Sequence, residues 1–318
     1  MYDVVIIGGG PAAVGAAVYA ARKKLNTVLI AKEFGGQSAI SASIENWIGD
    51  PVLTGFDLAQ KLEKHVRAQK GIEIASGELV VSVSEIPGNR SFAVTTESGK
   101  TLETKTVILA SGSRRRRLGV PGESKFEGKG VVFCSTCDAP LFGDKVVAVV
   151  GGGNAGLEAV VDLFPYARKI YLIVRSDTLK GDQVTQEEVK KSPKVEVIYN
   201  ALTQEIIGDN FVTGLRYQEK TTGEVKDLAV DGVFIEVGAV PNSEIIKSLV
   251  QMNAAGEVLI DHKTGATSKS GIWAAGDVTD EIYKQNNISV GDAVKAALSA
   301  YNYLLGLQRR SPAAESVQ

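Results

Sequence analysis

Cysteine and histidine are scarce in this sequence of 318 residues, which holds two of each. A closed zinc site needs four ligands, usually Cys or His, and His65 and His262 are scattered through the chain. These residues could not complete a zinc site unless carboxylates or a second subunit contributed. No G-x-S-x-G segment is present either, so the nucleophile turn of many hydrolases is missing. We therefore expect no metal centre and no hydrolase chemistry.

The sequence also lacks a long apolar run and an excess of either charge. No stretch of about 18 uninterrupted apolar residues occurs. The 35 basic and 37 acidic residues nearly balance, which gives no electrostatic reason to expect nucleic acid or an anionic membrane as a partner. Met1 to Asp3 lead directly into apolar residues, without the features of a signal peptide. We expect a cytoplasmic protein, in which a disulfide is more often catalytic than structural.

An ungapped internal repeat organises the chain. The segment from Val4 to Ile30 aligns with the segment that starts at Val146, so that Gly8 falls on Gly151. Each copy reads as an apolar strand, a glycine turn, a helix with apolar residues three and four apart, and a second strand. This is the βαβ unit of dinucleotide-binding folds, in which the glycine turn brings the backbone against a pyrophosphate at the helix start. The residues of the two turns are Gly8, Gly10, Pro11 and Ala12 in the first copy, and Gly151, Gly153, Asn154, Ala155 and Gly156 in the second.

The residues after each second strand indicate which nucleotide binds where. An acid about 20 residues past the turn normally holds the ribose hydroxyls, and the first copy has Glu33 there. The second copy has Ser176 at that place, with Arg175 beside it and Lys180 nearby. The acid that would repel a 2′-phosphate is missing, so NADPH is favoured, with NADH possible; an ordinary solvated strand end is the alternative interpretation.

Two later segments predict the domain organisation. TKTVILASGS (104–113) and GIWAAGDVTD (271–280) each carry an apolar strand into a turn of small residues. We predict an α/β fold with two Rossmann-like dinucleotide-binding domains: an FAD domain from residues 1–113 and 243–318, with a nicotinamide domain, 114–242, inserted in it. We also predict a helix near 56–69, strands within 79–86 and 91–98, and a disordered tail at 309–318.

Both cysteines lie in one short motif, Cys134-Ser-Thr-Cys137, followed by Asp138. Zinc lacks further ligands, and a disulfide across so short a loop constrains the unfolded chain little. A redox pair that cycles between dithiol and disulfide remains, with Asp138 able to exchange the proton that thiol chemistry requires.

The sequence resembles, over nearly its whole length, the low-molecular-weight thioredoxin reductases and the C-terminal flavoprotein portion of the alkyl hydroperoxide reductase flavoprotein subunit. The resemblance rests on GGGPAA (8–13), GGQ (35–37), IENWIGDP (44–51), VPGE (120–123), CSTCDAPLF (134–142), GGGNAG (151–156), AAGD (274–277) and YKQ (283–285).

The resemblance implies an enzyme that passes electrons from a nicotinamide nucleotide through FAD and a cysteine pair to a thioredoxin- or glutaredoxin-like protein, usually as a homodimer. Cys137 would face the flavin, Cys134 would attack the partner, and Asp138 would be the acid/base. The residues implied around the cofactors, besides those of the glycine turns, are Glu33, Gly36, Gln37, Asn46, Ala110, Gly112, Gly276, Asp277, Lys284 and Gln285 for FAD, and Arg175 and Lys180 for the nicotinamide nucleotide.

Departures from the family pattern leave alternatives open. NADPH-dependent thioredoxin reductases commonly show H-R-R-x-x-x-R where this chain has Val174-Arg175-Ser176 and then Lys180. No thioredoxin-like domains precede the match, so we expect a separate protein or small molecule to accept the electrons. Rival functions are a dithiol oxidase on the same scaffold, reoxidised by oxygen, and a non-catalytic flavin-bound redox sensor. The intact second glycine turn argues against the first, and the dithiol with Asp138 against the second.

Two surface features each permit two interpretations. The four arginines Arg114 to Arg117 either dock an acidic partner or form a solvated crossover, and the latter is favoured. Leu141 and Phe142 either contact a partner or pack in the core.

Overall fold

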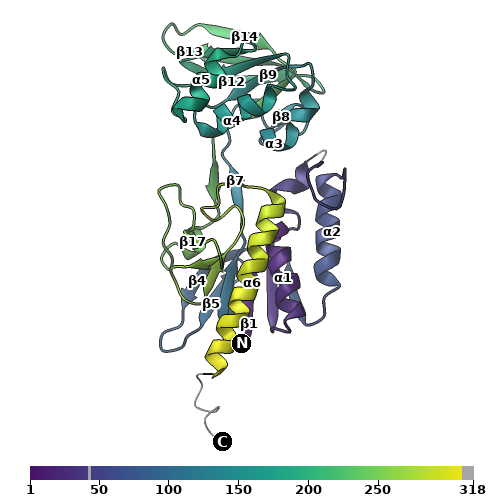
Figure 1. The fold of residues 1–318 in the computed structure, drawn as a ribbon, viewed down its shortest axis with the longest axis vertical. Helices are drawn as coiled ribbons and strands as arrows, with labels where there is room; N and C mark the ends of the chain where they lie inside the picture. The colour runs from purple at the N-terminus through teal and green to yellow at the C-terminus, as the bar shows by residue number, and fades with distance from the viewer. Residues whose placement is uncertain (42–43, 310–318) are drawn as a thin grey trace, which may run out of the picture. The chain divides into compact units, whose positions relative to one another are not determined.

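The computed structural model describes residues 1–41 and 44–309, and the chain divides into two compact units. Unit 1 contains Met1–Arg114 and Val240–Gln318, and unit 2 contains Arg115–Ala239 (Figure 1). The sequence analysis predicted borders after residues 113 and 242, where the two units divide after residues 114 and 239. The predicted disordered tail lies outside the described residues beyond residue 309.

Unit 1 is built on a mostly parallel sheet to which both ends of the chain contribute. Strand β1 (Tyr2–Ile7) pairs in parallel with β2 (Thr27–Ala31) and with β6 (Thr101–Leu109). On the other side of β6 lies β19 (Ile272–Ala274), also parallel, so that Trp273 is opposite Ile108. Residues far apart in sequence therefore complete one sheet.

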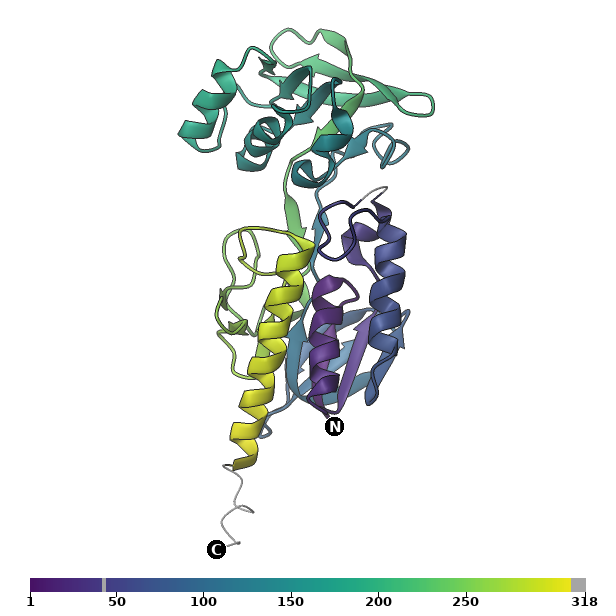
Figure 2. The ribbon, with the colours of Figure 1, turned by 45° about the vertical axis from the view of Figure 1, so that its right-hand side comes forward.

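Two helices of unit 1 pack closely because small residues face each other. Helix α1 (Pro11–Arg22) and helix α6 (Asn286–Arg309) lie side by side in both ribbon views (Figures 1 and 2). A Cβ on Gly15 of α1 would lie 3.3 Å from Val290 of α6, so glycine permits this approach. Alanines at 293, 296, 297 and 300 of α6 are buried in the same cluster. The helix faces that pack thus carry only small side chains, so the two backbones can approach each other closely.

The remaining elements of unit 1 include the predicted helix and the predicted pair of strands. Helix α2 (Gly55–Arg67) begins at Thr54, which forms a capping box with Asp57. Strands β4 (Val80–Glu85) and β5 (Phe92–Thr96) pair antiparallel. The other elements are η1 (Gly36–Ile40), β3 (Ile72–Ser76), η3 (Glu244–Ile246), β17 (Ile260–Asp261) and β18 (Ala266–Thr267).

Unit 2, whose residues are all described, repeats the arrangement of unit 1. Strand β9 (Val146–Val150), helix α4 (Asn154–Leu163) and strand β10 (Lys169–Ile173) form its βαβ unit, with β9 and β10 parallel. The five-stranded sheet has the order β11-β10-β9-β15-β8. A three-stranded antiparallel sheet follows the order β12-β13-β14. The architecture is the predicted one, α/β with two Rossmann-like units.

The other elements belong to unit 2 or to the two segments in which the chain passes from one unit to the other. They are β7 (Ser113–Arg115), β8 (Val131–Val132), α3 (Ser135–Asp138), η2 (Ala139–Phe142), α5 (Gln183–Lys191), β11 (Val195–Ile198), β12 (Ala201–Gly208), β13 (Val212–Glu219), β14 (Val225–Ala229), β15 (Gly232–Ile235) and β16 (Ala239–Pro241). The crossing strands β7 and β16 pair with each other.

Candidate active site

The first glycine turn requires glycine at its first position. Gly8 has φ +128°, and a Cβ there would lie 2.2 Å from the carbonyl oxygen of Ala110. Gly10 has ordinary extended angles and begins α1, with Pro11 as the first helical residue. A Cβ on Gly10 would meet only the Cα of Gly36, at 3.8 Å. Because the protein itself leaves room at Gly10, the glycine there is explained by a ligand that approaches the backbone rather than by packing.

A buried acceptor near this turn has no partner among the described residues. Gln37 donates through Nε2 to the Ser113 hydroxyl at 3.1 Å and to Asp277 at 3.3 Å. Its Oε1 atom is buried and accepts no hydrogen bond. An unpaired buried acceptor costs on the order of 1–3 kcal/mol, so this site lacks a donor. Hydroxyl or ring N–H groups, which FAD carries, would supply it, and the residues present therefore fit that cofactor.

The C-terminal segment brings further predicted residues to the same part of unit 1. Asp277 accepts from Gln37 and from Ser289 at 3.4 Å, which links it to α6. Gln285 accepts from Asn46 through its side chain at 3.3 Å. The ammonium group of Lys284 is paired with Glu257 at 3.0 Å, so its charge is balanced within the protein. Four of the predicted side chains thus form two hydrogen-bonded pairs, Gln37 with Asp277 and Asn46 with Gln285.

The remaining predicted residues of unit 1 are an exposed acid, three glycines with positive φ and two buried alanines. Glu33 is exposed two residues after β2, and its carbonyl oxygen lies 1.9 Å from where a Cβ on Gly9 would stand. Gly36, Gly112 and Gly276 all have positive φ, at 60°, 65° and 77°. Ala110 and Ala12 are buried.

In the second glycine turn, the glycines that protein packing requires are distinct from the one that is open to a ligand. A Cβ on Gly151 would lie 2.2 Å from the carbonyl oxygen of Glu236, and one on Gly156 would lie 2.0 Å from that of Gly151. Gly153, by contrast, has no protein atom within 4 Å of its Cβ position. The outer glycines are therefore needed for the turn and the middle one is free to face a ligand.

The segment after β10 folds back on this turn. Lys180 donates its backbone N–H to the carbonyl of Gly152 at 2.8 Å, and the Asn154 side chain accepts from the N–H of Asp182 at 2.7 Å. Arg175 and Lys180 are both exposed, and neither pairs with a carboxylate in the described part of the chain. Arg175 and Lys180 are thus two cationic side chains without an ion-pair partner among the described residues, in the segment that contacts the turn. Asp177 is exposed in the same segment.

Cys134 and Cys137 form a disulfide with their Cα atoms 5.3 Å apart. Cys134 precedes the single turn of α3, and the N–H of Asp138 closes that turn on the Cys134 carbonyl at 3.0 Å. Both cysteines are half-buried. The sulfur pair is therefore held on a short helical turn at partial exposure, where an exchange partner can reach it.

Three carboxyl groups surround this turn. Burial raises the pKa of Asp138 to about 6, although the Arg115 guanidinium acts against this. Burial likewise raises the pKa of Glu236 to about 8, again opposed by Arg115. Asp162 accepts hydrogen bonds from the hydroxyls of Ser135 at 2.8 Å and Thr136 at 3.3 Å. The redox pair thus lies beside two carboxyls whose pKa values burial raises well above those of ordinary acids.

The sequence analysis did not identify Glu236. It follows the buried strand β15 as an isolated acid, and no spacing in the sequence connects it with the cysteines. Only the pairing of β15 with β9 brings it to the glycine turn and to α3.

Of the two interpretations left open for Phe142, partner contact and core packing, the structure supports core packing. Phe142 is 4% exposed and its ring lies edge-on to that of Phe234. Leu141 is 42% exposed and remains available. The arginine run follows the favoured interpretation in part, because Arg114 pairs with Glu244 and Arg117 with Glu127.

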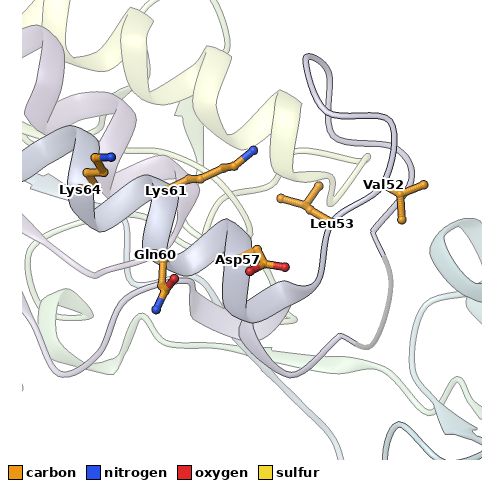
Figure 3. A pocket seen from close by; sticks show the side chains of 6 residues that line it. All are labelled: Val52, Leu53, Asp57, Gln60, Lys61 and Lys64. Carbon is orange, nitrogen blue, oxygen red and sulfur yellow. The ribbon is translucent and has the colours of Figure 1, made fainter.

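A surface hollow of about 380 Å³ in unit 1 is unrelated to these residues. It is lined by Val52, Leu53, Asp57, Gln60, Lys61 and Lys64, which lie on α2 and the segment before it (Figure 3). Asp57 is engaged in the capping box and Lys61 pairs with Asp50. Two of its three charged side chains, Asp57 and Lys61, are thus already partnered within the protein.

Two kinds of site were not found in the described residues. No group of three or more His, Cys, Asp or Glu side chains is placed to hold a metal ion. No helix within residues 1–41 and 44–309 has the length and apolar character needed to cross a membrane.

Comparison with known proteins defines the class to which this fold and site belong. The model of the pyridine nucleotide-disulphide oxidoreductase family matches residues 2–297. The thioredoxin reductase of Streptococcus pyogenes superposes with a TM-score of 0.89 at 34% identity, covering 96% of this chain and 99% of the other. The class is that of NAD(P)H-dependent flavoprotein disulfide oxidoreductases, and the chain belongs to the pyridine nucleotide-disulphide oxidoreductase family.

Curated relatives are longer than this chain. One subunit of the alkyl hydroperoxide reductase of Staphylococcus epidermidis is 42% identical over 304 residues, which cover 96% of this chain and 59% of the relative. A Bacillus subtilis protein named NADH dehydrogenase matches with the same identity and coverage. The chain thus spans about three-fifths of the length of these relatives, and resembles them and the thioredoxin reductases at once.

Proposed function

We propose that this chain is a disulfide reductase that takes electrons from a nicotinamide nucleotide and passes them through FAD and the Cys134/Cys137 pair to a thioredoxin- or glutaredoxin-like protein. The observation that carries the proposal is the Cys134–Cys137 disulfide, half-buried on the unit that contains the second glycine turn and adjacent to Asp138. A structural disulfide has no use for a neighbouring acid, whereas thiol–disulfide exchange involves proton transfers that a carboxyl with a raised pKa can mediate.

FAD is assigned to unit 1 and the nicotinamide nucleotide to unit 2. The orphaned Oε1 of Gln37 and the open face of Gly10 support the first assignment. The open face of Gly153 supports the second. Bound FAD would supply a carrier that accepts a hydride and delivers two electrons to a disulfide.

NADPH is the proposed donor, with NADH as a slower alternative. Arg175 and Lys180 are exposed and unpaired beside the second turn, and the position after Arg175 is Ser176 rather than an acid. The Ser176 hydroxyl donates to the Thr178 carbonyl at 2.7 Å, which fixes the loop that carries the two cations. A 2′-phosphate would find two charge-assisted contacts there.

The cysteines have separate roles in the proposed exchange. Reduction of the Cys134–Cys137 bond takes two electrons and two protons and leaves two thiols. The Cys134 thiolate then attacks the partner disulfide and forms a mixed disulfide, releasing one partner thiolate that takes up a proton. The Cys137 thiolate next attacks the Cys134 sulfur, which restores the original bond and releases the second partner thiol. Asp138, with its raised pKa, donates and accepts the proton between these steps.

The partner surface and the assembly are part of the same proposal. Leu141, three residues beyond Asp138, is the exposed large apolar side chain nearest in sequence to the pair and is proposed to contact the partner protein. The enzyme is proposed to work as a homodimer, as the resemblance implies.

Anaerobic titration of the purified protein tests this proposal. NADPH should bleach the bound flavin, and subsequent addition of an oxidised thioredoxin should restore the colour. The double variant Cys134→Ser, Cys137→Ser is the matched control, because it should bleach normally and show no reoxidation by the disulfide. A protein that no nicotinamide nucleotide bleaches, while thiols reduce it and oxygen reoxidises it, would instead be a dithiol oxidase.

A further inference from the structure

One acid on helix α4 contacts both residues that separate the two cysteines. The Ser135 hydroxyl donates to Asp162 at 2.8 Å, and the Thr136 hydroxyl donates to the same carboxylate oxygen, Oδ2, at 3.3 Å. Asp162 is half-buried and is the next-to-last residue of α4. Ser135 is 9% exposed, whereas Thr136 is exposed. Water therefore competes less with the shorter of the two hydrogen bonds than with the longer one.

The helical turn that carries the cysteines depends on contacts with the rest of unit 2. Helix α3 is a single turn of four residues, Ser135–Asp138. One turn of helix is unstable by itself, because few hydrogen bonds offset the cost of ordering its backbone. Buried Phe133 before the turn and buried Ala139 after it fix its two ends. Between these ends, the two hydroxyl groups connect the turn to Asp162 on the ten-residue helix α4.

The two hydrogen bonds are formed while the cysteines are joined as a disulfide. Reduction breaks the S–S bond, and the two sulfur atoms must then separate to van der Waals distance. The turn accommodates this separation most readily when its middle residues are free to move. Contacts that hold Ser135 and Thr136 in the disulfide form therefore stabilise that form relative to the dithiol. A pair stabilised as a disulfide has a lower reduction potential.

We propose that Asp162 is a positioning residue that acts through Ser135 and Thr136 to make the Cys134/Cys137 pair a stronger reductant. Because the anchored turn favours the disulfide, the reduced pair gives its two electrons and two protons to a partner disulfide more completely. This inference deepens the proposed function and rests on it, since the pair must cycle between disulfide and dithiol.

A redox titration that needs neither a nicotinamide nucleotide nor a partner protein tests this role. The FAD-loaded enzyme is equilibrated anaerobically at neutral pH with mixtures of reduced and oxidised dithiothreitol. Each reduced disulfide takes two electrons and two protons from dithiothreitol, which closes into a cyclic disulfide. Free thiols are then alkylated in denaturant and counted by mass spectrometry. Because the chain holds only these two cysteines, every alkylated thiol reports on the pair.

Asp162→Ala should shift the equilibrium roughly tenfold toward the dithiol, because a hydrogen bond to a charged group has about this effect on an equilibrium constant. A tenfold shift corresponds to a potential about 30 mV less negative for this two-electron couple. Asp162→Asn keeps an oxygen that can accept a hydroxyl, so it should restore part of the difference. Ser135→Ala should reproduce most of the shift and Thr136→Val little of it, because the Thr136 bond is longer and exposed.

A double-mutant cycle distinguishes action through the hydroxyl group from a direct effect of the charge. If Asp162 acts through Ser135, the substitution Ser135→Ala should add nothing to the shift when it is made in the Asp162→Ala protein. The matched control is Glu158→Ala, which removes a carboxylate one turn earlier on α4. Glu158 is exposed, and its carboxylate has no hydrogen bond or ion pair with another described residue. This variant should titrate like the wild type.

Two results would overturn the inference. One is an unchanged titration in both Asp162→Ala and Ser135→Ala. The other is a shift in Asp162→Ala that Ser135→Ala does not share, because the carboxylate would then act by its charge and not by holding the turn. If Asp162→Ala does not fold, Asp162→Asn and Ser135→Ala decide the question.

Failure of the proposed function would give a different result. In that case the wild-type pair would titrate with dithiothreitol, but NADPH would never reduce it. The two failures are therefore distinguishable.

Discussion

Substitution of Gly153 separates nucleotide binding from folding in the second glycine turn. Gly153 has φ −96° and ψ −172°, which any residue adopts, and no protein atom lies within 4 Å of its Cβ position. In Gly153→Ala the only expected cost to the fold is the poorer helix N-cap, about 0.5–1 kcal/mol. The added methyl group would, however, occupy the space through which a pyrophosphate approaches the helix start.

The expected loss is therefore in affinity. Removal of close contact between the turn and the pyrophosphate should weaken NADP⁺ binding roughly ten- to hundredfold, or about 1.4–2.8 kcal/mol. Calorimetric titration of the FAD-loaded protein with NADP⁺ measures this, and flavin absorbance reports that unit 1 is intact. The matched control is Gly143→Ala in the same unit, where the Cβ also meets nothing within 4 Å and φ is −56°.

The equivalent change in unit 1 gives an internal check. Gly10→Ala should lower the FAD content of the purified protein, because the Cβ there meets only Gly36 within the protein. Wild-type NADP⁺ affinity in Gly153→Ala, with a normal melting curve, would refute the assignment of the second turn to the nucleotide.

Three further predictions concern the charged and sulfur groups. Arg175→Ala should reduce kcat/KM for NADPH roughly ten- to hundredfold and change that for NADH little, because a charge-assisted phosphate contact contributes about 1.5–3 kcal/mol; equal losses with both donors would show that Arg175 does not contact the phosphate. Cys137→Ser should trap a mixed disulfide between Cys134 and the partner, whereas Cys134→Ser should trap none, and both should lose nearly all disulfide reductase turnover in a coupled assay. Asp138→Asn should raise the melting temperature at pH 8 but not at pH 4. The pKa of Asp138 is raised in the folded state, to about 6, so ionisation costs the wild type stability as the pH rises from about 4 to 6. Asparagine avoids this cost of up to about 3 kcal/mol. An equal difference in melting temperature between variant and wild type at both pH values would contradict the buried setting of the carboxyl.

The two βαβ units were predictable from the sequence because the glycines of their turns allow backbone conformations that other residues rarely adopt. A positive φ at Gly8 and Gly151, followed by a helix, gives a pattern that local sequence alone can indicate. The strand from TKTVILASGS and that from GIWAAGDVTD were predicted to close one unit, and β6 and β19 are indeed neighbours.

The features that could not be predicted depend on contacts between residues that are far apart in the sequence. Glu236 acquires its setting only because β15 lies beside β9, which carries its end to Ser135. Phe142 stands beside exposed Leu141 in sequence, yet it is buried, because a Cβ at Gly232 would collide with its ring and only glycine there leaves it room. Whether an aromatic residue faces a partner or a core is decided by such contacts and not by its own type.

The order in which the sheet of unit 1 is assembled has a consequence for synthesis of the chain. Strand β6 is made early, but its neighbour β19 follows only after all of unit 2 has been made. Unit 2 is contiguous, so a growing chain can complete it while unit 1 still has an open sheet edge and an α1 without α6. Until the last segment arrives, β6 presents unpaired backbone groups and apolar side chains to the surroundings. Released chains that end near residue 240 should therefore show unit 2 protected from proteolysis and unit 1 susceptible.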